Sequence, residues 1–223
     1  MSENDTLVSA QHFAYIAERT PKDDAFMREL RDEAVKAGIP SIAVGAAQAS
    51  FMQILLKLNR CKDVIEVGTL AGYSAIAMAR ALPEDGQVRT IELVEAHAKF
   101  AQEWADKPKS GVAGRVKVFQ GGGSDVLPSF EDNSADAAFL DADKGGYKIY
   151  LRECMRIVRP GGLIMVDNAF AFGELFATDP KDRETAAVRE FNEIMAREVL
   201  MPGTKLQGII CAIGDGMWVA VKA

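Results

Sequence analysis

From Asp63 onward, short apolar runs alternate with glycine-bearing turns and longer segments of helical composition, and few folds accommodate this rhythm. A short apolar run bounded by glycine or charge is typical of a strand buried on both faces. Strands that alternate with helices in this way form a parallel sheet with helices on both faces. We therefore predict an α/β fold with a mostly parallel sheet. The expected strands are Val64–Val67, Val88–Leu93, Val116–Phe119, Ala137–Leu140 and Leu163–Val166, and the expected helices are Ala75–Ala81, Ala96–Ala105 and Tyr147–Ile157.

The N-terminal part of the chain carries no such strands and is expected to be helical. A helical segment is predicted from about Ser9 to Ala37, with a break before Pro21, which suits the first turn of the second helix. A further helix is predicted over Ala46–Leu58. Residues 1–60 are therefore interpreted as an N-terminal helical extension. The apolar face of the last of these helices is expected to consist of Phe51, Ile54, Leu55 and Leu58.

The C-terminal part departs from the alternation of strands and helices in another way. A helix over Glu184–Glu198 is followed by two predicted strands, Gly208–Ile213 and Met217–Val221. The sequence Gly214-Asp215-Gly216 between them is a tight glycine-rich turn, which predicts an antiparallel hairpin at one side of the sheet. The hairpin brings the expected sheet to seven strands. Residues 61–223 are interpreted as the α/β core of a single domain that spans residues 1–223.

Two acidic clusters directly follow two of the predicted strands. Asp141-Ala142-Asp143-Lys144 follows the strand that ends at Leu140, and Asp167-Asn168 follows the strand that ends at Val166. Ligands of open α/β sheets bind beyond the carboxyl ends of the strands. If the two strands are neighbours, Asp141, Asp167 and Asn168 converge on one point. Two carboxylates and an amide carbonyl suit a hard, oxygen-seeking cation such as Mg²⁺, so a metal site is predicted there.

The first predicted strand runs into a loop of the form E-x-G-x-x-x-G, from Glu66 to Gly72. Glycines at such a position let backbone N–H groups approach an anionic ligand, although a tight turn without a ligand is the alternative. The spacing is not the G-x-G-x-x-G of dinucleotide-binding folds. Glu92 stands at the end of the next strand, where a carboxylate accepts hydrogen bonds from ribose hydroxyls. The pattern favours a ribose-containing ligand without a diphosphate, and S-adenosylmethionine fits, with its ammonium near an acid such as Glu66.

Charge and composition argue against several classes of protein. The formal net charge of −6 opposes a dominant electrostatic role in nucleic-acid binding. The first six residues are acidic and polar, unlike a signal peptide, and no apolar stretch is long enough to span a bilayer. Cys61, Cys154 and Cys211 lie far apart among apolar neighbours and are interpreted as reduced core residues. We expect a cytoplasmic protein without a membrane contact.

In this order and spacing, the motifs resemble those of the cation-dependent class I O-methyltransferases, the caffeoyl-CoA and catechol O-methyltransferase group. The resemblance runs from about Val44 to the C-terminus and lies in EVGTLAGYS, LPEDG, FLDADKGGY, RPGGLIMVDN and the closing IGDG. It implies the Rossmann-like methyltransferase fold, S-adenosylmethionine as methyl donor, and a homodimer with the N-terminal helices as a contact surface. It also implies that Asp141, Asp167 and Asn168 hold a divalent metal ion.

The resemblance also assigns roles to individual residues. Lys144 matches the general base proposed for the catechol enzymes and, with Asp141, forms the expected catalytic pair. The alternatives for Lys144 are a solvated loop lysine or an ion pair with Asp143. Three consecutive glycines at positions 121–123 are expected to loosen the loop on the adenine side. The residues expected at the S-adenosylmethionine site are Glu66, Gly68, Thr69, Ser74 and Glu92, with Val44, Ser124, Asp141 and Asp143 near it.

The segment after Asn168 departs from the family pattern. Family members often carry a tryptophan three residues after this asparagine, followed by Asn or His, where the present chain has Ala171 and Phe172. The difference argues against plant-type recognition of an acyl-CoA. Phe170, Phe172 and Phe176 either line an aromatic substrate pocket or serve as ordinary lid or dimer packing, and both interpretations remain open.

The predicted function is metal-dependent transfer of a methyl group from S-adenosylmethionine to a hydroxyl of a small catechol or related vicinal dihydroxy aromatic. Chelation of two vicinal oxygens lowers the pKa of the hydroxyl and fixes the attacking oxygen, which favours a single displacement. One alternative is methylation of a hydroxylated uridine in tRNA, which the acidic balance disfavours. Others are an NAD-dependent dehydrogenase, which the glycine spacing opposes, and a non-catalytic binding module, which the complete acidic set opposes.

Overall fold

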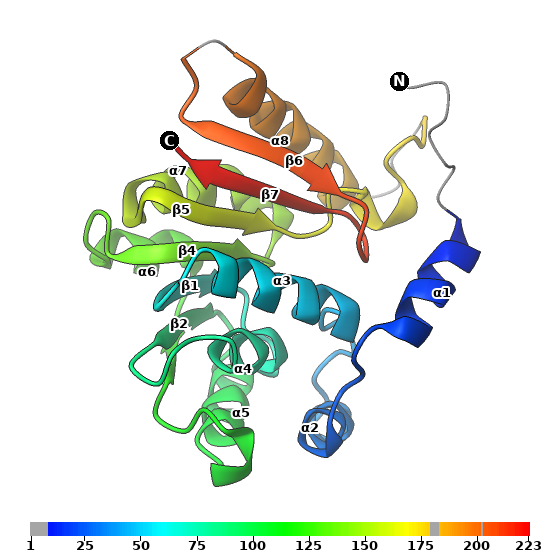
Figure 1. Ribbon diagram of the computed structural model, residues 1–223, viewed down its shortest axis with the longest axis vertical. Helices are drawn as coiled ribbons and strands as arrows, with labels where there is room; N and C mark the ends of the chain where they lie inside the picture. Colours follow the sequence, from blue (N-terminus) through cyan, green and yellow to red (C-terminus); the bar gives the residue numbers. More distant parts are fainter. Residues whose placement is uncertain (1–8, 179–182, 202) are drawn as a thin grey trace.

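The computed structural model describes residues 9–178, 183–201 and 203–223 and is built around one seven-stranded sheet (Figure 1). The strand order is β3-β2-β1-β4-β5-β7-β6. Strands β1 to β5 pair in parallel, whereas β7 runs antiparallel to both of its neighbours, β5 and β6. The predicted fold class is therefore confirmed. The strands are β1 Asp63–Val67, β2 Gln87–Glu92, β3 Val116–Gln120, β4 Ala135–Leu140, β5 Val158–Val166, β6 Leu206–Cys211 and β7 Met217–Lys222.

Helices cover both faces of the sheet, because side chains of the central strands alternate between two hydrophobic clusters. Phe139 and Met165 pack into the cluster that contains α2 to α5, and Leu140 and Val166 pack into the cluster that contains α7 and α8. None of the helices in the described segments is long and apolar enough to cross a membrane. The α-helices are α1 Ala10–Arg19, α2 Ala25–Lys36, α3 Ala46–Leu58, α4 Tyr73–Ala79, α5 Glu95–Ala105, α6 Gly123–Val126, α7 Tyr147–Ile157 and α8 Arg183–Leu200, and the 3-10 helices are η1 Pro108–Ser110, η2 Leu127–Ser129, η3 Lys144–Gly146 and η4 Ala171–Gly173.

The start of α2 differs from the prediction. The helix begins at Ala25, and the preceding Asp24 is its N-cap, with a side chain that accepts a hydrogen bond from Met27 N at 2.8 Å. Pro21 therefore lies before the helix, because an aspartate that satisfies a free helical N–H is a better start than a proline four residues away. Residues of α2 and α3 share one hydrophobic cluster with the sheet, which supports the proposal that residues 1–223 form one domain.

The buried face of α3 also differs from the prediction, although the bounds of the helix agree with it. Ala49, Met52 and Leu56 are buried, whereas Ile54 and Leu58 are 53% and 77% exposed. Apolar residues occur around most of this helix, so the periodicity alone could not select the face that meets the sheet. The outer side of α3 is consequently an apolar surface.

The predicted C-terminal hairpin is confirmed, with Ile210 of β6 opposite Trp218 of β7. The order of its strands follows from pairing with the rest of the sheet. Ala220 of β7 lies opposite Ile164 of β5, so β7 is inserted beside the parallel strands and β6 forms the sheet edge. This insertion brings the turn between β6 and β7 to the same end of the sheet as the residues that follow β5 (Figure 1).

Gly68 allows the loop after β1 to contact the end of β4. Its backbone has φ +100°, and a Cβ at this position would lie 1.9 Å from the carbonyl oxygen of Asp141. Its N–H also donates to Ile91 O on the other side, at 3.0 Å. The glycine is therefore required by the packing of three neighbouring strand ends, in addition to any contact with a ligand.

Gly68→Ala is expected to lower the free energy of unfolding by at least about 2 kcal/mol, because positive-φ strain costs roughly 1–3 kcal/mol and a backbone overlap adds to it. Gly38→Ala is the matched control, since Gly38 has φ +80° with nothing within 4 Å of the added Cβ. It should lose about 1 kcal/mol. Urea unfolding of the ligand-free variants measures both losses, and equal losses would contradict the packing argument.

Candidate functional site

A cavity of about 790 Å³ opens at the carboxyl ends of the central strands. Here β1 lies between β2 and β4, so the connection after β1 runs toward one edge of the sheet and the connection after β4 runs toward the other. Open α/β sheets bind ligands at the point where the direction of the connections changes in this way. The structure brings all but one of the predicted site residues to this cavity. Those that line it are Val44, Gly68, Thr69, Ser74, Glu92, Ser124, Asp141, Asp143, Lys144, Asp167 and Asn168.

The two acidic clusters meet at one end of the cavity because β4 and β5 are neighbours in register. Asp141 N donates to the last carbonyl of β1 at 2.9 Å, and Asp167 N donates to the last carbonyl of β4 at 3.0 Å. Burial raises the pKa of Asp167 to about 7, and the negative charge of Asp141 contributes to the same shift. A cation between two such carboxylates would relieve this repulsion.

Asn168 completes the predicted set of oxygen donors. Its side-chain Nδ2 donates to Asp215 Oδ2 at 3.2 Å, which leaves its amide oxygen available as an acceptor. No group of three or more His, Cys, Asp or Glu side chains placed to hold a metal ion occurs in the part of the chain that the structure describes. Two carboxylates and one amide oxygen therefore remain the candidate donors, a set that fits a hard cation with water in its remaining positions.

Lys144 is buried at this end of the cavity and is only 7% exposed. Its Nζ lies 3.2 Å from Asp141 Oδ1 and 2.7 Å from the hydroxyl of Tyr147. Asp143 instead accepts a hydrogen bond from Tyr150 at 2.6 Å. The alternatives of a solvated loop lysine and of an ion pair with Asp143 are therefore wrong in this structure, which pairs Lys144 with Asp141.

The opposite end of the cavity is shaped by Glu92 at the end of β2. Its two carboxylate oxygens accept hydrogen bonds from Leu70 N at 2.8 Å and from Val94 N at 2.9 Å. These bonds fix the carboxylate in one orientation at the cavity wall. Because each carboxylate oxygen has a second lone pair, Glu92 can still accept hydrogen bonds from a ligand.

Glu66 is the predicted site residue that does not line the cavity. It is fully buried, and the hydroxyl of Thr90 donates to its Oε2 while its Oε1 has no hydrogen-bond partner among the described residues. Burial raises the pKa of Glu66 to about 8, although the nearby Ser74 and Thr90 hydroxyls oppose the shift. Among the predicted site residues, Glu66 is the one whose buried side chain has an oxygen without a hydrogen-bond donor in the described part of the chain.

The segment that carries Val44 is held in place by α2, which the sequence did not predict. Arg31 donates from Nη2 to Val44 O at 2.6 Å, and its guanidinium lies 3.7 Å from the centroid of the Tyr73 ring. Asp23 accepts from Arg31 Nε at 2.9 Å. Val44 and Tyr73 both line the cavity, so the N-terminal extension forms part of its wall.

The structure separates the three phenylalanines that follow Asn168. Phe172 lines the cavity, and its ring centroid lies 5.8 Å from Lys144 Nζ. Phe170 packs against the backbone of Gly216, and Phe176 is 91% exposed. The position of Phe172 agrees with an aromatic pocket, and the position of Phe170 agrees with ordinary packing.

Tyr150 is a cavity residue that the sequence analysis missed. Its ring occupies a slot between two glycines, since an added Cβ would lie 2.6 Å from the ring at Gly123 and 2.3 Å from it at Gly146. The expectation that the glycines at 121–123 loosen this loop is therefore wrong for Gly123, which allows a large side chain to pack closely. The two glycines are separated by about twenty residues of sequence, one at the start of α6 and one at the end of η3, so a single sequence shows no pattern that links them.

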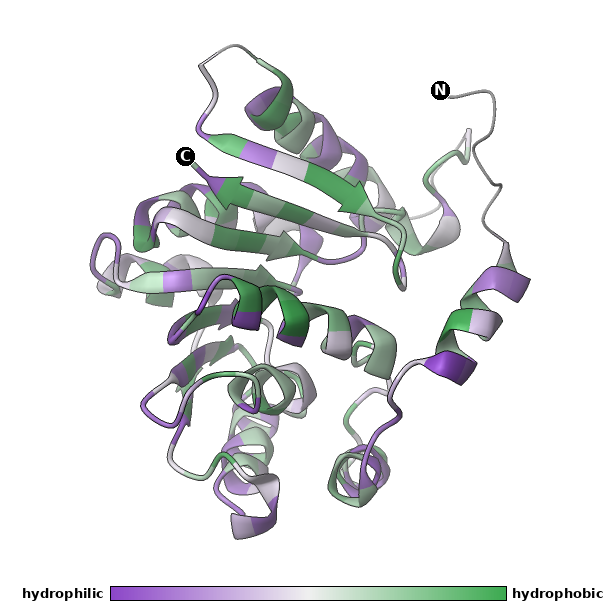
Figure 2. Ribbon diagram, in the orientation of Figure 1, coloured by the Kyte–Doolittle hydropathy of each residue, from purple (hydrophilic) through white to green (hydrophobic). Residues whose placement is uncertain are grey.

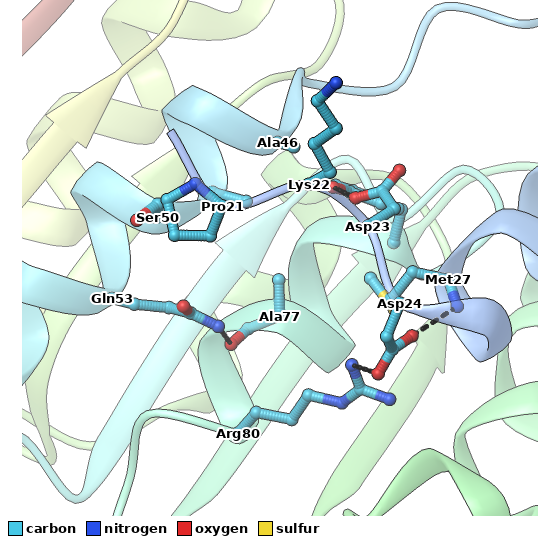
Figure 3. Close-up of a pocket in the computed structure, with 12 residues that line it drawn as sticks. Pro21, Lys22, Asp23, Asp24, Met27, Ala46, Ser50, Gln53, Ala77 and Arg80 are labelled. Carbon is cyan, nitrogen blue, oxygen red and sulfur yellow. Dashed lines mark hydrogen bonds and ion pairs between the residues drawn. The ribbon is translucent and has the colours of Figure 1, made fainter. Parts of the chain in front are cut away.

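A second cavity, of about 190 Å³, lies between α2, α3 and α4 (Figure 3). None of the predicted site residues lines it. Arg80 pairs with Asp24 at 2.9 Å, and Gln53 Nε2 donates to Ala77 O at 2.7 Å. Because these polar groups already satisfy one another, this cavity is a gap between helices rather than a candidate ligand site.

The raised pKa of Glu66 predicts a pH dependence of stability. Between its usual pKa of 4.5 and about 8, the folded protein keeps a proton that the unfolded chain releases, so the free energy of unfolding should fall as pH rises through this window. Glu66→Gln removes the titrating group. Its stability relative to the wild type should increase steadily from pH 5 to pH 8 in urea unfolding of the ligand-free proteins, and parallel curves would contradict the assignment.

Comparison with known proteins identifies the family of the chain. Residues 17–223 match the family model described as O-methyltransferase. The chain is 34% identical to a catechol O-methyltransferase from Niastella koreensis, with 98% of each chain covered. It also superposes, with a TM-score of 0.82 in each case, on an O-methyltransferase from Bacillus cereus in complex with SAH (28% identity, covering 95% of this chain and 96% of the other) and on one from Streptomyces achromogenes, involved in tomaymycin synthesis, in complex with SAM (27% identity, covering 96% of each). The dehydrogenase and the non-catalytic module are thereby set aside, and the chain belongs to the O-methyltransferase family.

Proposed function

We propose that this O-methyltransferase transfers the methyl group of S-adenosylmethionine to one hydroxyl of a small catechol or related vicinal dihydroxy aromatic. The observation that carries the proposal is a single cavity with two chemically different ends. Glu92 lines one end, Asp141, Asp167 and Asn168 line the other, and the loop after β1 lies between them, in contact with Asp141. A donor with a ribose and an acceptor with two adjacent oxygens would meet within it.

The donor end suits S-adenosylmethionine, the ligand class of the two superposed structures. Glu92 would accept hydrogen bonds from the ribose hydroxyls, and the backbone of Gly68 and Thr69 would contact the methionine part. The unpaired oxygen of Glu66 would receive a proton donor from the ligand's ammonium, directly or through a bound water. Val44, Ser74, Ser124 and Asp143 would complete the enclosure.

The acceptor end suits a divalent cation, which Asp141, Asp167 and Asn168 would hold. When bound, such a cation lowers the pKa of a chelated hydroxyl and fixes its orientation. In its neutral amine form, Lys144 Nζ, oriented by Asp141 and Tyr147, would take the proton from the acceptor hydroxyl and become an ammonium. As the acceptor oxygen bonds to the methyl carbon, the carbon–sulfur bond breaks and its electron pair returns to the sulfonium, so no covalent enzyme intermediate forms.

The identity of the acceptor follows from less direct observations. The relative from Niastella koreensis is a catechol O-methyltransferase, and Phe172 supplies an aromatic surface near Lys144. Methylation of a hydroxylated uridine in tRNA is the second candidate, opposed by the net charge of −6.

The described cysteines are unpaired and two of them are buried, which supports the proposal that the enzyme is cytoplasmic.

The proposal predicts that methylation of a dihydroxybenzoate needs a divalent cation and stops in excess EDTA. Tracer assays with catechols, an acyl-CoA ester and bulk tRNA would identify the acceptor class. Asp141→Asn should lower kcat/KM for the catechol by about 100-fold or more, because the donor set and the partner of Lys144 are both weakened, while S-adenosylmethionine affinity stays within about tenfold. Undiminished turnover in EDTA, or preference for tRNA, would refute the proposal.

We also propose that two copies associate through an apolar surface made by the outer side of α3 and the face of β6 and β7 that lies opposite α8. Ile54 and Leu58 of α3 and Ile209 and Val221 of the hairpin are all more than one-third exposed. On this face of the hairpin, Met217 and Val219 pack into the cluster that contains α3, whereas Ile209 on the edge strand β6 is exposed, and β7 is largely hydrophobic (Figure 2). Exposed apolar surface of this kind is typical of an interface.

Ile209→Lys is expected to convert a dimer into a monomer in sedimentation velocity at micromolar concentration, since a buried lysine at an interface has no partner. Ile149→Lys on α7 is the matched control, because Ile149 is also exposed (41%) but lies on the other side of the sheet. A wild type that sediments as a monomer, or an equal effect of both variants, would overturn the proposed interface.

A further inference from the structure

The turn between β6 and β7 carries an aspartate to which the proposed function gives no role. Asp215 lies between Gly214 and Gly216, both of which have positive φ values, and the turn packs against the loop that follows β5. A Cβ at Gly216 would lie 2.8 Å from the ring of Phe170. The hairpin turn and the loop after β5 are therefore in close contact.

The loop after β5 has a strained backbone. Asn168, Ala171 and Phe172 have φ values of +65°, +53° and +58°, in the left-handed region that L residues other than glycine rarely adopt. Such conformations cost on the order of 1–3 kcal/mol each and persist only where the surroundings enforce them. The strain matters most at Phe172, because its backbone conformation determines where a bulky side chain that lines the cavity is placed.

One side-chain oxygen of Asp215 accepts hydrogen bonds from two of these three residues. Its Oδ2 accepts from Asn168 Nδ2 at 3.2 Å and from the backbone N–H of Phe172 at 2.8 Å. Its carbonyl oxygen accepts from Phe170 N at 2.8 Å, and the carbonyl of Gly216 accepts from Ala169 N at 2.9 Å. The side chain of Asp215 therefore links the candidate metal ligand to the candidate aromatic wall.

The chemistry of a carboxylate determines which group donates and which accepts in these hydrogen bonds. An ionised Asp215 only accepts hydrogen bonds, so Asn168 must turn its NH₂ group toward Asp215 and its amide oxygen away. Through the second bond, the same carboxylate holds Phe172 N in place. This bond retains the backbone conformation in which the Phe172 ring centroid lies 5.8 Å from Lys144 Nζ.

We infer that Asp215 is a positioning residue of the acceptor end, where it orients the amide oxygen of Asn168 toward the cation and Phe172 toward the acceptor ring. The inference rests on the proposed function. Asp215 does not line the cavity, and its side-chain bonds reach only the loop after β5. Its effect should therefore be confined to cation and acceptor binding and should spare the donor end.

Two substitutions test the side chain of Asp215. Asp215→Ala removes both side-chain bonds. Because one oxygen, Oδ2, accepts both bonds, Asp215→Asn can keep both through its single amide oxygen and is the conservative variant. Gln207→Ala is the matched control, because Gln207 is exposed on β6 of the same hairpin. Mn²⁺ affinity by electron paramagnetic resonance, S-adenosylmethionine affinity by calorimetry, and acceptor KM and kcat are measured for each protein.

Asp215→Ala is expected to weaken Mn²⁺ binding by about 10- to 100-fold, the usual loss when the partner of a metal ligand is removed, and to raise acceptor KM by about tenfold. S-adenosylmethionine affinity should stay within about twofold, because the donor end is untouched. Asp215→Asn keeps an acceptor oxygen for both bonds, so it should lie closer to the wild type than Asp215→Ala in both Mn²⁺ affinity and acceptor KM. Gln207→Ala should match the wild type in all four measurements.

Two results would overturn the inference. If a folded Asp215→Ala protein keeps wild-type Mn²⁺ affinity and acceptor KM, Asp215 only joins the two loops and does not position the acceptor end. If its affinity for S-adenosylmethionine falls as much as its affinity for Mn²⁺, the effect of Asp215 is not confined to one end of the cavity. If Asp215→Ala does not fold, Asp215→Leu, which removes both bonds but keeps the approximate shape of the side chain, decides by the same measurements. Failure of the proposed function is distinguishable, since the wild type itself would then bind no Mn²⁺ and methylate no catechol.

Discussion

The close contact between the loop after β1 and the end of β4 is the constraint on which the rest of the site depends. It requires the absence of a side chain at Gly68, where a Cβ would overlap the carbonyl oxygen of Asp141. This contact brings the donor loop and the first acidic cluster to adjacent positions on one cavity wall. A larger residue would separate the two ends of the cavity, so a local steric requirement determines whether donor and acceptor can meet.

Around this contact, the protein buries several ionisable side chains close to one another. Glu66 has one oxygen without a hydrogen-bond partner among the described residues, and its pKa is raised by burial. Asp167 is buried near the negative charge of Asp141, and Lys144 is buried beside the same aspartate. Folding alone gains little from such an arrangement, because buried charges are stabilising only when fully partnered. Buried groups of this kind are concentrated at functional sites, where a bound ligand supplies the missing interactions.

The two ends of the cavity are supported by different parts of the chain. Arg31 of α2 holds the Val44 segment at the donor end, and Asp215 of the β6–β7 turn holds the loop at the acceptor end. Neither residue touches the cavity itself. The N-terminal extension and the C-terminal hairpin, the two parts that depart from the βα rhythm, thus each fix one end of the site. Changes in either part can alter one binding function without the other.

The sequence by itself determined the strands, most helix positions and the placing of Asp141, Asp167 and Asn168 at the carboxyl ends of two strands, because buried parallel strands have a clear apolar pattern. That these two strands are neighbours, so that the three side chains line one cavity, was decided by the tertiary structure. The tertiary structure alone decided which face of α3 is buried, since apolar residues surround that helix. It alone placed Glu66 outside the cavity, paired Lys144 with Asp141, and revealed Tyr150 and Asp215. These features depend on contacts between residues far apart in the chain, and no local periodicity encodes such contacts.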